Sequence, residues 1–116
     1  MTPRIVTTQK LLKQILTPHH KIVFEIKNED EKPISIKETR TLIQKISFSS
    51  GEGDSIETYL INNAHTLTTS AQNNLLKTLE ETAQNKQIIL ITETPQMLLS
   101  TILSRCHLHQ EKIQPR

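Results

Sequence analysis

The strongest constraint on the fold is the alternation of β-type and helix-type segments along the chain. β-type runs rich in isoleucine, leucine and valine occupy residues 21–27, 56–61 and 87–92, and a short one is expected at 106–109. Segments with helical periodicity occupy residues 8–16, 35–47 and 68–83, and another begins at Thr94-Pro95. Four rounds of alternation predict an α/β fold, with a mostly parallel sheet flanked by helices.

Local signals predict where these helices begin. Ser35 and Glu38 stand three residues apart, the spacing of a capping box. Threonines precede the other helices, and proline after Thr94 suits a first helical position. We expect the helix after Thr94 to turn four side chains inward: Met97, Leu98, Thr101 and Ile102. The run 87–92 is apolar on both faces, which predicts a central strand covered by helices on each side.

Size and composition predict one domain in a reducing compartment. A chain of 116 residues has the length of one ordinary domain, so we expect a single domain over residues 1–110 and a short tail over 111–116. The single cysteine, Cys106, has no partner within the chain, and no apolar run approaches the ~20 residues that span a membrane. The first residues lack a secretory pattern, so a cytoplasmic protein is expected. A net charge of +2 does not by itself predict nucleic-acid binding.

Three blocks of sequence carry a family resemblance. The first runs from Tyr59 to Thr68 (YLINNAHTLT), the second from Ala71 to Glu81 (AQNNLLKTLEE), and the third joins residues 89–92 to Leu98–Cys106 (LLSTILSRC). In this order and spacing, over residues 34–110, they resemble the clamp-loader branch of the AAA+ ATPases, specifically the delta prime and gamma/tau subunits of bacterial DNA polymerase III. The resemblance implies a reduced P-loop NTPase core and a role in DNA replication. Its helix motif corresponds here to Asn73, Leu75, Leu76, Lys77, Glu80 and Glu81.

Both nucleotide motifs of that family are absent or altered. Its first motif is a glycine-rich loop ending in Gly-Lys-Ser/Thr, but Gly51 and Gly53 are the only glycines and neither precedes a lysine. Its second motif ends a strand with Asp-Glu, and Asn62-Asn63 occupy those places here. An amide carries no charge for Mg²⁺ and cannot act as a base. We therefore expect no enzyme activity and no cofactor, and Thr92 at the sensor position has no nucleotide to sense.

Two interpretations of Asn62 and Asn63 remain open from the sequence. They can simply end a strand and form a turn, for which asparagine is well suited. Their amides can also keep a residual polar role. Both interpretations exclude catalysis.

Ser104-Arg105-Cys106 gives the most specific functional hypothesis. The resemblance implies that Arg105, with Ser104 before it, is an arginine finger that acts in trans on the ATP of a neighbouring subunit. The alternative is a solvated arginine favoured by the dipole near a helix end. The implied partners are the gamma/tau motor subunits, with the sliding clamp as a further candidate and DNA contacted indirectly or weakly.

The same comparison predicts missing parts. We expect the chain to pass from the helix at 8–16 directly to the strand at Ile22, with the first strand and phosphate loop deleted, which would leave a gap in the sheet. No lid or collar domain is expected. Two functions therefore remain: a non-catalytic clamp-loader component that offers Arg105, or a stand-alone domain that binds a protein or nucleic acid.

Other candidate sites have a simpler explanation. Cys106 is expected to be a small core residue, because no base is identifiable nearby. His107 and His109 should share one side of a strand, a metal-binding spacing that lacks a third ligand. Glu80 and Glu81 are expected on a solvated helix face. Scattered lysines that could meet phosphates are better explained by solubility: Lys10, Lys13, Lys21 and Lys27.

Overall fold

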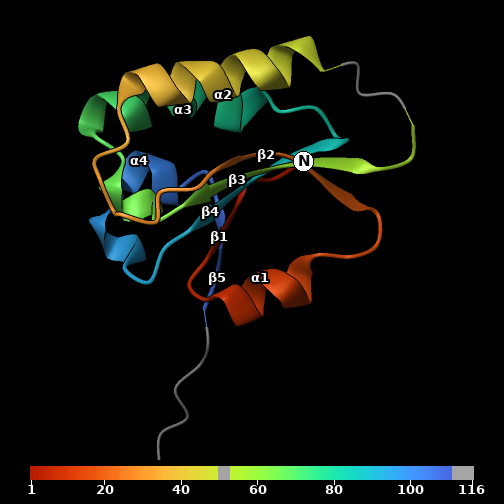
Figure 1. Ribbon diagram of the computed structural model, residues 1–116, viewed down its shortest axis with the longest axis horizontal. Helices are drawn as coiled ribbons and strands as arrows, with labels where there is room; N and C mark the ends of the chain where they lie inside the picture. The colour runs from red at the N-terminus through yellow and green to blue at the C-terminus, as the bar shows by residue number, and fades with distance from the viewer. Residues whose placement is uncertain (50–52, 111–116) are drawn as a thin grey trace, which may run out of the picture.

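The computed structural model describes residues 1–49 and 53–110. It contains a five-stranded parallel sheet with helices on both faces (Figure 1). The strands are β1 (Arg4–Val6), β2 (His20–Ile26), β3 (Ile56–Asn62), β4 (Lys86–Ile91) and β5 (His107–His109). The helices are α1 (Gln9–Ile15), α2 (Ile36–Phe48), α3 (Thr69–Glu81) and α4 (Ser100–Leu103), with short 3₁₀ turns η1 (Ala64–Thr66) and η2 (Pro95–Met97). The α/β class and the parallel sheet predicted from the sequence are confirmed.

The expected deletion of the first strand is wrong. The sheet order is β2-β3-β4-β1-β5, so β1 lies between β4 and β5 and leaves no gap. Ile5 pairs with Leu90 of β4 and with Leu108 of β5. With only three residues and a charged first position, β1 shows no sequence alternation, yet Ile5 and Val6 are both fully buried.

The two faces of the sheet carry separate apolar clusters. On one face α2, α3 and α4 pack over Ile5, Tyr59, Ile88 and other inward side chains. On the opposite face α1 stands alone and packs Leu12 against Val6, Leu60 and neighbouring strand residues (Figure 1). The alternation of side chains along each strand places successive residues in different clusters. Helices on both faces explain why the predicted central strand, now β4, is apolar throughout.

Three of the predicted helix starts, at Thr8, Ser35 and Thr68, are confirmed by their capping contacts. The Thr8 hydroxyl accepts the N–H of Leu11 at 3.1 Å, and Thr68 caps α3 in the same way. At the start of α2, the Ser35 N–H donates to the Glu38 carboxylate at 2.7 Å. Each contact satisfies a backbone donor that the first turn of a helix leaves free.

The helix expected after Thr94 is interrupted. Residues 95–97 form η2, Leu98 and Leu99 are extended, and α4 restarts at Ser100. The buried side chain of Gln72 explains the interruption, because its Oε1 accepts the N–H of Leu99 at 2.8 Å and holds this segment extended. Leu98 and Ile102 are buried as predicted, but Met97 is 61 % exposed and Thr101 is exposed, which corrects the expected inward face.

Two further predictions concern the tail and membrane-spanning segments. The predicted tail at 111–116 lies outside the residues that the structure describes. Within residues 1–49 and 53–110, no helix combines the length and apolar character required to cross a membrane.

Candidate functional site

The carboxyl edge of the sheet contains the residues that the sequence assigned to nucleotide chemistry. The helix α1 leads from β1 toward β2 on one side of the sheet, whereas the chain after β4 leads to β5 on the other side. β1 and β4 therefore flank a switch point in the sheet, and ligands of α/β proteins bind at such points. Two adjoining hollows of about 370 and 220 Å³ lie at this edge. Their shared lining residues are Gln9, Asn63 and Ile91.

The connection from β1 to α1 enters this edge and is very short. Only Thr7 and Thr8 separate the strand from the helix. A phosphate-binding loop of the Gly-Lys-Ser/Thr type extends over about eight residues, whose amides surround the phosphates. The Thr8 hydroxyl already caps α1. The strand and helix that flank such a loop are present here, but the loop between them is reduced to a tight turn.

Asn62 and Asn63 bind neighbouring parts of the protein. The Nδ2 of Asn62 donates to the Glu25 carboxylate at 2.8 Å and to the Ile26 carbonyl at 3.2 Å, joining the end of β3 to the edge strand β2. Asn63 has a left-handed backbone with φ of 51°, which asparagine tolerates better than most residues. Its Nδ2 donates to the carbonyl of Asn28 at 2.7 Å. Both amides therefore hold the ends of strands together, and Asn63 also forms the predicted turn.

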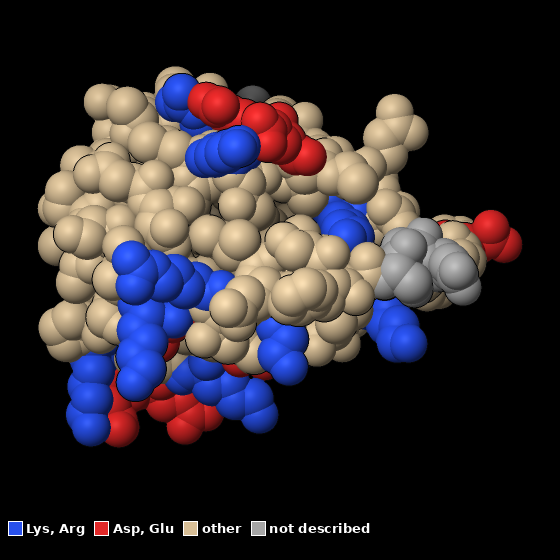
Figure 2. Space-filling view, turned by 90° about the horizontal axis from the view of Figure 1, so that it is seen from above, with Lys and Arg blue, Asp and Glu red and all other residues tan. Residues whose placement is uncertain are grey.

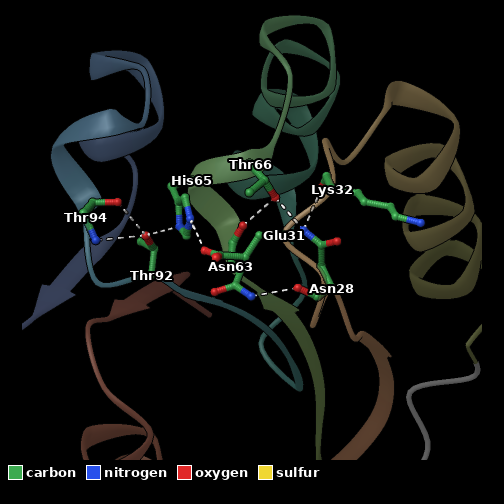
Figure 3. Close-up of polar contacts among 8 residues, drawn as sticks. All are labelled: Asn28, Glu31, Lys32, Asn63, His65, Thr66, Thr92 and Thr94. Atoms are coloured by element: carbon green, nitrogen blue, oxygen red, sulfur yellow. Dashed lines mark hydrogen bonds and ion pairs between the residues drawn. The ribbon is translucent and has the colours of Figure 1, made fainter.

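A polar network extends from Asn63 through the loop that follows β2 (Figure 3). The Nδ2 of Asn28 donates to the Lys32 carbonyl at 2.8 Å and to the Thr66 hydroxyl at 2.7 Å. Thr66 in turn donates to the carbonyl of Asn63 at 2.7 Å. These contacts fix the loop against the end of β3.

His65 links the same loop to the end of β4. Its Nδ1 lies 2.9 Å from the Thr92 hydroxyl and its Nε2 lies 2.9 Å from the Glu31 carboxylate (Figure 3). The Thr92 hydroxyl also accepts the N–H of Thr94 at 3.1 Å, and Thr92 is only 2 % exposed. The sensor-position threonine thus has partners within the chain. Sequence reasoning missed His65 and Glu31, although His65 belongs to the YLINNAHTLT block.

The charges around the carboxyl edge oppose phosphate binding. Carboxylates of Glu25 and Glu29 line the larger hollow, with Lys27 as its single basic residue. Glu31 and Glu93 line the smaller hollow, which includes no lysine or arginine. Negative side chains at close range disfavour a polyanion. The described lining of the two hollows therefore carries four glutamates and one lysine, a charge balance that is unfavourable for phosphates.

Arg105 lies at the opposite, amino edge of the sheet, just before β5. Its Nε donates to the Glu80 carboxylate, and its Nη1 donates to the Thr101 carbonyl at 2.8 Å and to the Ser104 hydroxyl at 3.4 Å. A hollow of about 410 Å³ lies beside it, bordered also by residues 1–3. Since β4 alone has six residues, the two edges are ~20 Å apart, and Arg105 cannot reach Asn62 or Asn63 of its own chain.

The helix motif is divided between core and surface. Leu75 is fully buried and Leu76 is partly buried against the core, whereas Asn73, Lys77 and Glu81 are exposed. Glu80 and Glu81 are both exposed, as expected for a solvated helix face, and Glu80 also pairs with Arg105. The structure therefore brings together two blocks of the family resemblance through Glu80 and Arg105, which lie 25 residues apart.

Cys106 has the properties of a core residue. Its side chain packs partly buried against the cluster under α2, α3 and α4, and burial raises the pKa of its thiol to about 12. A thiol with this pKa stays protonated at neutral pH, which makes it a poor nucleophile.

His107 and His109 share one side of β5 as predicted, with ring centroids 4.6 Å apart. Nη1 of Arg4 lies 3.2 Å from Nε2 of His109, so a guanidinium occupies the place where a third metal ligand would be needed. Burial, then Arg4 and His107, lower the pKa of His109. Across residues 1–49 and 53–110, no group of three or more histidine, cysteine or acidic side chains could hold a metal ion.

Comparisons with known proteins agree with this architecture. The family model described as "DNA polymerase III, delta subunit" matches residues 7–114. The delta' subunit of DNA polymerase III from Bacillus subtilis is 40 % identical over 85 residues, which cover 72 % of this chain and 26 % of that protein. The tau subunit from Escherichia coli is 39 % identical over 71 residues, covering 61 % of this chain and 11 % of that protein.

A solved structure gives the fold. The DNA polymerase III gamma subunit-related protein of Thermotoga maritima superposes with a TM-score of 0.75 and 22 % identity, covering 97 % of this chain and 42 % of that one. The chain therefore spans about a quarter or less of the length of these two curated relatives.

Proposed function

We propose that this chain, which belongs to the DNA polymerase III delta subunit family, is a non-catalytic clamp-loader component. In this role it offers Arg105 to the ATP of a neighbouring motor subunit. Its relatives are DNA polymerase III subunits, including delta' and tau. We further infer that this chain is a pseudo-ATPase of the delta prime type.

The observation that carries the proposal is the position of Arg105. Its guanidinium lies at the amino edge beside an open hollow. The place where its own chain would bind a nucleotide is at the carboxyl edge, one strand length away. An arginine placed in this way cannot reach a nucleotide at the carboxyl edge of its own chain, so any nucleotide phosphate that it binds must belong to another molecule. A planar, permanently charged guanidinium is well suited to developing phosphate charge.

The carboxyl edge supports the absence of ATP hydrolysis by this chain. The turn between β1 and α1 contains only two residues. The amides of Asn62 and Asn63 bind other parts of the chain, and carboxylates line both hollows. Among the described residues that line this edge, Lys27 is the single lysine or arginine, whereas phosphoryl transfer uses several cationic contacts to the phosphates.

The partners follow from the same proposal. We expect gamma/tau motor subunits to bind this chain, with the sliding clamp as a further candidate. Figure 2 shows the side covered by α2 and α3, where lysine and arginine side chains gather along one margin with acidic side chains among them. This mixture supports weak or indirect contact with DNA, because firm nucleic-acid binding needs a basic face.

The test combines the chain with the gamma/tau motor subunit from the same cell. Arg105→Ala should lower ATP hydrolysis by the motor subunit at least ~10-fold while sedimentation still detects the complex, since arginine fingers contribute 10³-fold or more in other phosphoryl-transfer enzymes. Arg40→Ala, an exposed arginine on α2, is the matched control and should leave hydrolysis unchanged. Unchanged hydrolysis with Arg105→Ala in a stable complex would contradict the proposal.

A second candidate function is protein binding without any nucleotide role. Phe48 at the end of α2 is 85 % exposed and borders a hollow of about 380 Å³ with Val23 and Lys45. An exposed aromatic of this size beside the open edge strand β2 favours a protein contact. Loss of association with Phe48→Ser, combined with normal hydrolysis in Arg105→Ala, would support this second function.

A further inference from the structure

The contact between Glu80 and Arg105 joins two rigid parts of the fold. Glu80 lies in the last turn of α3, and Arg105 is the second residue after α4. Buried neighbours anchor both positions, since Leu79 beside Glu80 and Ile102 before Arg105 are at most 3 % exposed. The two backbones are therefore fixed relative to each other, and the ion pair fixes the side chain of Arg105 as well.

The contacts of the guanidinium use particular atoms. Nε donates to the Glu80 carboxylate, and Nη1 donates to the Thr101 carbonyl and the Ser104 hydroxyl. Nη2 makes none of these three hydrogen bonds. The guanidinium is thus held through Nε and Nη1, and Nη2 has donor capacity with which it could bind an anion.

We propose that Glu80 is a positioning residue for Arg105, which holds the guanidinium in the orientation that a neighbour's phosphates require. The inference rests on the proposed function of Arg105. A long arginine side chain loses much rotamer freedom when it binds, and prior ordering reduces that loss. Glu80 supplies this ordering without touching the reacting atoms.

The exposure of the pair makes this role separable from a structural one. The side chains of Arg105 and Glu80 are 32 % and 46 % exposed. Exposed ion pairs contribute little to folding stability, so loss of Glu80 should leave the fold intact. Any change in catalysis would then report on the position of Arg105.

The test measures ATP hydrolysis by the gamma/tau motor subunit in complex with variants of this chain. Glu80→Ala should lower kcat about tenfold and leave KM for ATP unchanged, because misplacement of a charge-stabilising group reduces the rate of the chemical step. Glu80→Gln keeps an oxygen that accepts from Nε, so its kcat should lie between those of Glu80→Ala and the unmodified chain. The matched control is Glu81→Ala, which removes the adjacent exposed carboxylate and should not change kcat.

A second measurement uses the chain without a partner. Phenylglyoxal modifies accessible arginines, and mass spectrometry can follow Arg105 separately from Arg4 and Arg40. We expect Glu80→Ala to increase the modification rate of Arg105 several-fold and to leave Arg40 unchanged. Equal rates in Glu80→Ala and Glu81→Ala would overturn the inference.

The outcomes distinguish this inference from the function on which it rests. If Arg105→Ala lowers kcat and Glu80→Ala leaves it unchanged or raises it, only the role of Glu80 is wrong. If Arg105→Ala itself has no effect in a stable complex, the proposed function fails first. In the double variant Glu80→Ala with Arg105→Ala, kcat should equal that of Arg105→Ala alone, and a further decrease would contradict action through Arg105.

Discussion

The side chain of Gln72 on α3 accepts the backbone N–H of Leu99 at 2.8 Å, deep between α3 and α4. The same side chain donates from Nε2 to the carbonyl of Leu67 at 3.1 Å. One buried amide therefore connects the turn before α3 to the turn before α4. Because α4 leads directly to Arg105, this amide also helps to set the position of the proposed arginine finger.

Substitution of this amide should destabilise the fold. Gln72→Leu leaves a buried N–H and a buried carbonyl without partners, which we expect to cost about 1–3 kcal/mol of unfolding free energy. Urea denaturation would measure this difference. Asn73→Leu, an exposed change on the same helix, should stay within about 0.5 kcal/mol and is the control. Equal midpoints for the two variants would argue against the contact.

The place of β1 inside the sheet can be tested with a substitution that leaves a cavity. Ile5 is fully buried between β4 and β5, so Ile5→Ala should cost about 2–5 kcal/mol. Ile22→Ala makes the same chemical change on the edge strand β2, where the side chain is 50 % exposed, and should cost much less. Guanidinium unfolding of both variants decides the question, and a small effect at Ile5 would mean that β1 is not part of the sheet core.

Stability should depend on pH through His109. Burial and the neighbouring Arg4 and His107 lower its pKa in the folded chain below the ordinary value of 6.5. The unfolded chain therefore binds the proton more readily, so this contribution to stability is present above pH 6.5 and is lost as pH falls through the lowered pKa. Thermal unfolding from pH 7.5 to 5 should show the loss, and His109→Gln should reduce its slope. An unchanged slope would exclude His109 as its source.

Restoring the acidic motif should weaken the fold. In Asn62→Asp, a donor to the Glu25 carboxylate becomes a second carboxylate, and we expect a cost of about 1–3 kcal/mol at pH 7. The repulsion raises the pKa of the pair in the folded state, so the penalty exists above that pKa and disappears as pH falls through it toward the ordinary range near 4. Urea midpoints at pH 7 and pH 4 test this. Asn62→Ala loses the hydrogen bond without the repulsion, so its deficit should persist at pH 4.

The sequence predicted the regular parts of the fold because their signals are local. Caps at Thr8, Ser35 and Thr68 and the apolar run of β4 lie within a few residues of the elements that they define. The exceptions depend on distant partners. β1 has three residues and is recognisable only by its neighbours in the sheet, and the interruption before α4 depends on Gln72, 27 residues away.

The candidate site followed the same division. The family blocks located Asn62, Asn63, Thr92 and Arg105, because those residues occupy fixed places in short motifs. The contacts of these residues could not be predicted, since Glu25 reaches Asn62 and Glu80 reaches Arg105 from other segments. A sequence spacing specifies which face a side chain occupies but not which distant carboxylate it meets.

The two-residue turn between β1 and α1 has an evolutionary consequence. Substitutions at Asn62 and Asn63 can change charges at the carboxyl edge, but they cannot lengthen a turn that Val6 and Gln9 close from both sides. A phosphate cradle of about eight residues would require an insertion at this point. That insertion would have to separate Thr8 from the start of α1 and rebuild the cap there. If the proposed function is correct, single substitutions in this crevice therefore cannot produce a phosphate-binding loop, and only an insertion in the turn can do so.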